Sequence, residues 1–184
     1  MENGSDHNSS NKKSRGQWTA KVAEILRSEF PDFDVFYDHG DSSRRIVCYV
    51  GDNNERGTQL SYLDIAVVKK NTNQAIALIE IEETANRPKT IIADIFAFLL
   101  GETVIYNRTK LQISNKTTFI VLGFSNKRVS VHTQHIRERV SQAKSAIDTK
   151  NAEVWEVVVE VYSSKEQLFS KTISLVNQAI QQQT

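Results

Sequence analysis

The spacing of apolar residues along the chain predicts several helices. Apolar positions recur at helical spacing over residues 17–30. Residues 88–101 are apolar nearly all round, so we expect the helix that they form to be buried. An amphipathic helix follows over residues 135–147, and Ser164 with Gln167 forms a capping box that opens a last helix.

Shorter runs of alternating or continuously apolar residues predict the strands. These runs cover residues 33–37, 46–50, 59–68, 75–83, 118–124 and 154–162. The polar interval 69–74 is typical of a hairpin turn. Because helices and strands alternate along the second half of the chain, we expect an α/β fold with a mixed β-sheet flanked by helices.

Length and composition indicate one globular domain behind a polar tail. The chain has 184 residues, of which 39% are hydrophobic and 24% charged, which is enough for a substantial core. Residues 1–15 carry no apolar side chain after Met1, so we expect a disordered tail and a single domain over 16–184. Without a secretory leader or a run of about 18 apolar residues, we expect a cytoplasmic chain with no membrane partner. The one cysteine, Cys48, excludes an internal disulfide and a cysteine-based zinc site.

Charge is distributed unevenly along the chain. Residues 22–64 hold nine acids and four bases, whereas residues 103–139 hold seven bases and one acid. A basic segment beside an acidic one is typical of a polyanion-binding face next to a metal-binding one. Ordinary scatter over a solvated surface is the alternative, and the counts leave both open.

Three carboxylates fall together on the predicted hairpin. Antiparallel pairing across the turn sets Asp64 almost opposite Glu80, with the two side chains about 5 Å apart. Glu82 lies two residues beyond Glu80 and therefore shares its face of the strand. Such carboxylates repel one another unless a divalent cation compensates them, and that cation can also activate water at a phosphodiester. An acidic strand face paired with a neighbouring arginine or lysine is the structural alternative.

This set of residues resembles the PD-(D/E)xK nuclease superfamily, whose restriction-endonuclease-like fold has the core order αβββαβ. The similarity covers residues 17–125, after which a C-terminal αβα follows. In that family an acid begins one strand and (D/E)-x-K lies on the next. The resemblance implies that Asp64 and Glu80 bind Mg²⁺ or Mn²⁺. It further implies a metal-dependent endodeoxyribonuclease, either of restriction type or selective for DNA structure.

Glu82 stands where the family has its lysine. Some restriction endonucleases of this superfamily carry E-x-E and are active with the second glutamate near the attacking water, and this is the catalytic role that we expect for Glu82. In other members the lysine moves to a nearby element, for which Lys89 is the candidate. A third interpretation is a decayed site, in which the chain is a non-catalytic module that binds nucleic acid or a protein partner.

DNA and a second copy of the chain are the partners that the resemblance implies. We expect bases on either side of the scissile bond to neutralise phosphates. These bases are Lys89, Arg108, Lys110, Lys116, Lys127 and Arg128. Because duplex DNA has two strands, we expect a homodimer. Family members often add a glutamate from the first helix, and the helical angle favours Glu29 as this accessory acid, unless an arginine holds it at the helix edge.

Overall fold

The computed structural model describes residues 17–38, 44–51, 57–83, 88–124, 135, 138–139, 141–142, 145 and 156–183. Within these ranges the chain forms three helices and two β-sheets, which makes it a mixed α/β protein as the sequence predicts. The predicted tail over 1–15 and most of the predicted helix over 135–147 lie outside the described residues. The positions of that helix that are described are helical and exposed. None of the helices within the described ranges is long and apolar enough to cross a membrane.

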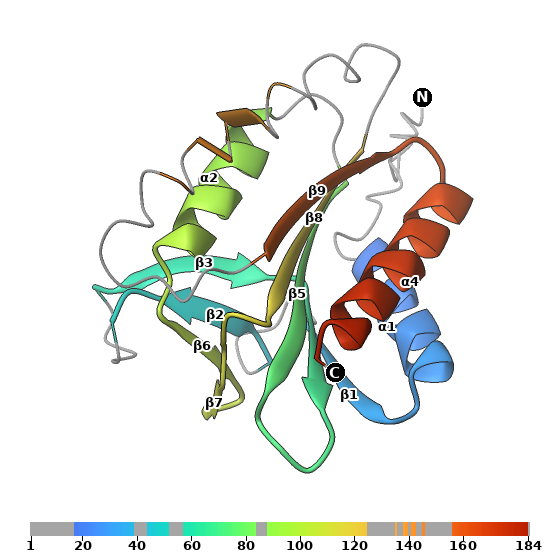
Figure 1. Ribbon diagram of the computed structural model, residues 1–184, viewed down its shortest axis with the longest axis horizontal. Coiled ribbons are helices and arrows are strands. Elements are labelled where there is room, and N and C mark those ends of the chain that lie inside the picture. Colours follow the sequence, from blue (N-terminus) through green and yellow to red (C-terminus); the bar gives the residue numbers. More distant parts are fainter. Residues whose placement is uncertain are drawn as a thin grey trace, which may run out of the picture.

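The larger sheet has five strands in the order β1-β4-β5-β8-β9 (Figure 1). Its strands are β1 (Phe33–Tyr37), β4 (Ile65–Lys69), β5 (Ala75–Glu82), β8 (Thr118–Phe124) and β9 (Glu156–Tyr162). The pairs β1–β4 and β4–β5 are antiparallel, whereas β5–β8 and β8–β9 are parallel. The central strands β5 and β8 are apolar runs because elements cover them on both faces.

Helices α1 (Gln17–Glu29) and α4 (Lys165–Gln181) cover one face of the larger sheet (Figure 1). Val22 and Leu26 of α1 and Leu168 of α4 are buried against it. The predicted capping box is confirmed, since the backbone N–H of Gln167 donates to Ser164 Oγ at 3.3 Å. The Gln167 side chain in return accepts from the backbone N–H of Ser163, at 3.0 Å.

A smaller sheet and helix α2 (Pro88–Leu99) share the core on the other face. The smaller sheet has the order β3-β2-β6-β7. Its strands are β2 (Ile46–Tyr49), β3 (Gln59–Leu63), β6 (Thr103–Tyr106) and β7 (Thr109–Leu111). Phe98 of α2 stacks on Phe119 of β8 with ring centroids 3.9 Å apart, so α2 packs directly on the larger sheet.

The predicted single strand over residues 59–68 is wrong. β3 ends at Leu63 and β4 begins at Ile65, and the two strands belong to different sheets. Asp64 is the one residue between them. Apolar alternation continues through this point, so the pattern reports extended backbone but not the change of sheet. The sequence reading also leaves β6 and β7 unassigned.

Helix α2 is less buried than its composition predicts. Ile91, Ile95 and Phe98 pack into the core, but Ile92 is 37% exposed and Phe96 43%, and Leu100, just after the helix, is 51% exposed. The expectation that this helix is buried all round is therefore wrong for one of its stripes. An all-apolar sequence carries no periodicity from which a buried side could be read.

The chain leaves α2 at Gly101, which lies against the thiol of Cys48. A Cβ at Gly101 would lie far inside van der Waals contact with Cys48 Sγ, and the backbone of Gly101 is not in the left-handed region. Gly101→Ala should therefore lower the free energy of unfolding by about 1–3 kcal/mol through overpacking alone. Urea denaturation measures this loss. In a Cys48→Ala background the same substitution should cost clearly less, and an equal cost in both backgrounds would exclude the contact as the cause.

Candidate functional site

Asp64 and Glu80 come together where the larger sheet meets the smaller one. β4 pairs with β5 so that Ile65 lies opposite Ile79, which places Asp64 beside Glu80 one step further along the pair. The backbone N–H of Ile81 donates to Asp64 Oδ2 at 2.7 Å. This bond fixes one carboxylate of the predicted set across the strand pair and confirms the predicted register.

The environment of both carboxyl groups disfavours their charged forms. Burial raises the pKa of Asp64 to about 7, opposed by hydrogen bonds from the Ile81 N–H and the Thr19 side chain. Burial raises the pKa of Glu80 well above its usual range, and the charge of Asp64 raises it further. Glu80 Oε2 is buried and accepts no hydrogen bond. A buried carboxylate oxygen without a donor is costly, so this atom has the environment of a ligand or of a protonated acid.

Asp94 is a fourth acid at this site, and the sequence analysis misses it. It lies on α2, where Ser61 Oγ is 3.5 Å from its Oδ1. Burial raises the pKa of Asp94 to about 6, and the charge of Glu82 contributes to the rise. Glu82 therefore lies close enough to interact with this acid. The available signal was a single acid within the otherwise apolar stretch of α2.

Backbone and hydroxyl groups enclose the rim of the site. The backbone N–H of Trp18, in the first turn of α1, donates to Glu83 Oε1 at 3.2 Å. Tyr162 Oη, at the end of β9, donates to the carbonyl oxygen of Glu82 at 3.1 Å. Burial, followed by the charges of Glu83 and Glu82, raises the pKa of Tyr162. The N-terminal end of α1, whose dipole favours negative charge, thus lies at the acidic site.

Asp64, Glu80 and Asp94 have other acids as the charged neighbours that raise their pKa values. Of the lysines and arginines that the structure describes, none forms an ion pair with Asp64, Glu80 or Asp94. For Asp64 and Glu80, the alternative of an acidic strand face neutralised by a neighbouring base therefore does not hold among the described residues. Equally, no three acidic, histidine or cysteine side chains of the described ranges stand close enough together to bind one metal ion. Among the described residues, the ligands that this site can offer to a cation are therefore Asp64 and Glu80.

The structure places Lys89 in the first turn of α2 and Glu29 at the last residue of α1. Lys89 is exposed in the first turn of α2, five residues before Asp94 and therefore about 140° round the helix from it. Glu29 is exposed at the last residue of α1, whereas Thr19, which contacts Asp64, lies about 15 Å back along the helix axis. The structure does not bring Glu29 to the site, because a helical angle indicates one side of a helix and not one of its ends.

In the predicted basic segment, Arg108, Lys110 and Lys116 lie at the end of β5 opposite the carboxylates. Lys116 precedes β8, which runs parallel to β5 with Thr118 opposite Ala77, so it lies where β5 begins and not where Glu80 stands. Arg108 and Lys110 belong to the exposed β6–β7 hairpin. Lys127 and Arg128 lie outside the described residues. The described bases of this segment therefore do not surround the carboxylates.

The stability of the fold should depend on pH through Asp64, Glu80 and Asp94. Their pKa values are raised in the folded chain, so the folded state binds more protons than the unfolded one between about pH 4 and pH 7. In EDTA the melting temperature should therefore fall as the pH rises through this window. Asp94→Asn should flatten the fall, because the amide does not titrate. A melting temperature that is constant or rises from pH 5 to pH 8 would contradict these shifts.

Chemistry alone defines what this site can do. Comparison of the chain with protein-family models, with curated proteins and with solved structures gave no match. Two adjacent buried carboxyl groups, one with an oxygen that lacks a donor, can bind a cation or hold a proton. Asp94 on α2 extends the same negative region.

Proposed function

We propose that the protein is a metal-dependent endonuclease that hydrolyses DNA phosphodiester bonds and acts as a homodimer. The observation that carries this proposal is the pair Asp64 and Glu80, which is buried without a described cation. The unpartnered Oε2 of Glu80 supports it, because a divalent ion would supply the missing positive charge.

The order of elements supports a restriction-endonuclease-like fold. Around the larger sheet, α1, β1, β4, β5, α2 and β8 follow the expected order αβββαβ. The strands of the smaller sheet lie between members of this series, β2 and β3 before β4, and β6 and β7 before β8. They are consistent with additions to a common core. In this arrangement the two acids lie where β4 begins and β5 ends.

In the proposed enzyme, Asp64 and Glu80 would hold Mg²⁺ or Mn²⁺. Two protein carboxylates suit Mg²⁺, which keeps several water ligands and often takes the rest of its shell from substrate phosphate. When bound, the ion supplies Lewis-acid stabilisation and an acidified water. The chain's own part is to orient Asp64 through the Ile81 N–H and the Thr19 side chain. Glu82, which interacts with Asp94, would accept a proton from the attacking water.

A non-catalytic module that binds nucleic acid or protein is the second candidate. Two observations favour it: no described lysine forms an ion pair with Asp64, Glu80 or Asp94, and Glu82 stands at the position of the family's lysine. Such a module would keep the fold and the acids without a group that stabilises the leaving charge. It predicts binding without cleavage.

Two measurements on the purified chain separate the candidates. Duplex, single-stranded and branched DNA are incubated with the protein in Mg²⁺, Mn²⁺ or EDTA, and we expect cleavage only with metal. Millimolar Mg²⁺ or Mn²⁺ should also raise the melting temperature, since a ligand of the native state shifts unfolding. Metal stabilisation without cleavage of any substrate would favour the module. The absence of both cleavage and a melting-temperature shift would contradict the metal site itself.

A further inference from the structure

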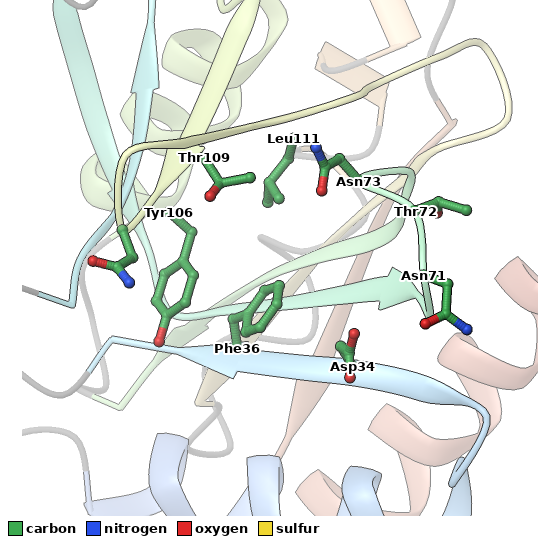
Figure 2. Close-up of a pocket in the computed structure, with 9 residues that line it drawn as sticks. Asp34, Phe36, Asn71, Thr72, Asn73, Tyr106, Thr109 and Leu111 are labelled. Carbon is green, nitrogen blue, oxygen red and sulfur yellow. The ribbon is translucent and has the colours of Figure 1, made fainter.

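A second site lies at the opposite end of β5 from the carboxylates. A cavity of about 520 Å³ opens there between the two sheets (Figure 2). It is bounded by β1, by the β4–β5 turn and by the β6–β7 hairpin. The backbone N–H of Gln112, just after β7, donates to the carbonyl oxygen of Asn73 at 2.7 Å, which ties one wall to the other. A volume of this size is typical of small-ligand pockets.

Two stacked rings form an aromatic wall of the cavity. Phe36 of β1 and Tyr106 of β6 lie with ring centroids 4.5 Å apart and planes inclined by 16°. Figure 2 shows both rings reaching into the space between the strands, with Leu111 above them. Aromatic side chains held in this way are surfaces on which a flat ring can pack, and base–aromatic stacking is a main source of affinity for unpaired bases.

Polar side chains with unused hydrogen-bonding groups surround the rings. Figure 2 shows Asp34 and Asn73 beside the cavity on the side of Phe36 away from Tyr106. Together with Asn107 and Thr109 they line it, and none of these four side chains hydrogen-bonds to another described residue. A carboxylate accepts from exocyclic amino groups, and asparagine amides pair with base edges through one donor and one acceptor. The cavity thus combines an apolar face with groups that suit the edge of a nucleobase.

Two basic residues lie next to residues that line the cavity. Lys70 precedes the lining residue Asn71, and Arg108 lies between Asn107 and Thr109. Both are exposed, and neither forms an ion pair with a residue of the described ranges. A neutral sugar could use the rings and the amides, but it would leave these charges unused. Positive charge beside a stacking surface is the arrangement that single-stranded nucleic acids require.

We propose that this cavity binds an unpaired nucleobase of a single-stranded nucleic acid. The base packs on the wall of Phe36 and Tyr106, Asp34 accepts from an exocyclic amino group, and Lys70 and Arg108 contact the flanking phosphates. The inference rests on the proposed function only in taking nucleic acid as the ligand. Because Asp34 requires a donor, the cavity favours cytosine over uracil, which has a carbonyl oxygen in place of the amino group.

Binding is measured on the full chain in EDTA, so that metal-dependent cleavage plays no part. Fluorescence anisotropy compares labelled heptamers of deoxycytidine and deoxyuridine, and calorimetry tests free cytidine monophosphate. The test variant is Asn73→Ala with Asn107→Gly, which removes two amides while glycine preserves the positive φ of 46° at position 107. Asn115→Ala is the matched control, an exposed asparagine outside the cavity. The melting temperature of each variant verifies its fold.

We expect the cytidine heptamer to bind about tenfold more weakly to the double variant than to the wild type, and the Asn115→Ala protein to bind normally. Asp34→Asn, which is isosteric, should erase the preference for cytosine even if the double variant fails to fold. Arg108→Asn should reduce the salt slope by about 0.7. Binding of free cytidine monophosphate but not of the heptamers would show that the cavity takes a free nucleotide and not a base of a nucleic-acid strand. Equal binding by all variants, or no binding of either ligand, would overturn the proposal whether or not the chain cleaves DNA.

Discussion

Asp64→Asn should abolish metal-dependent cleavage while making the metal-free protein more stable. The substitution keeps the shape of the side chain and an oxygen that can accept from the Ile81 N–H. It removes one of the two carboxylates proposed to hold the ion, whose contribution of several kcal/mol corresponds to a rate loss of at least about 10²-fold. It also removes a buried charge beside Glu80, so at pH 8 in EDTA the melting temperature should rise by about 3 °C or more.

The opposite signs of the two effects distinguish a functional acid from a structural one. Glu80→Gln should behave in the same way, because Glu80 Oε2 has no donor to lose. Asp32→Asn is the matched control, since this exposed aspartate lies in the turn between α1 and β1 and should change neither property. A wild-type cleavage rate in Asp64→Asn or Glu80→Gln would exclude these residues as metal ligands. A lower melting temperature in EDTA would show that their charges stabilise the fold.

Glu82→Gln should lose most of the activity, by about 10²-fold or more, because an amide cannot accept the proton of the attacking water. Lys89→Ala should leave the rate nearly unchanged. We expect this ranking because Glu82 interacts with Asp94, whereas Lys89 forms no ion pair with a described acid. Cleavage rates of the two variants, measured with one DNA substrate at saturating metal, test it.

The reverse ranking would identify Lys89 as the displaced lysine of the family motif. Glu82→Lys sharpens the comparison because it restores the common pattern. We expect this variant to be inactive. The surroundings of position 82, including Asp94, accommodate a carboxylate in the native chain and are not arranged to position an ammonium group at the attacking water. An active Glu82→Lys enzyme with normal metal dependence would show that Glu82 is a tolerated substitution without a catalytic role.

Local patterns in the sequence predicted the secondary structure that depends on local interactions. The helix over residues 17–30, the capping box at Ser164 and the hairpin around residues 69–74 are confirmed. The pairing of Asp64 with Glu80 could be predicted for the same reason, because a short turn fixes the register of the strands that it joins.

Features that depend on contacts distant in sequence could not be predicted in this way. The change of sheet at Asp64 follows from pairing with β2 on one side and with β1 and β5 on the other. Asp94 reaches the site only because α2 packs across the larger sheet, and Glu29 misses it because α1 approaches with its other end. The short strands β6 and β7 need the partner β2 to be recognised as strands.

Asp64 is the single residue that connects a strand of the smaller sheet to a strand of the larger one. One residue separates β3, which pairs with β2 in the smaller sheet, from β4, which lies between β1 and β5 in the larger sheet. A rotation of one sheet against the other would therefore strain the backbone at Asp64 and the bond from the Ile81 N–H that holds its carboxylate. The stack of Phe36 on Tyr106 joins β1 of the larger sheet to β6 of the smaller one, so it helps from a distance to hold the geometry of the acidic pair.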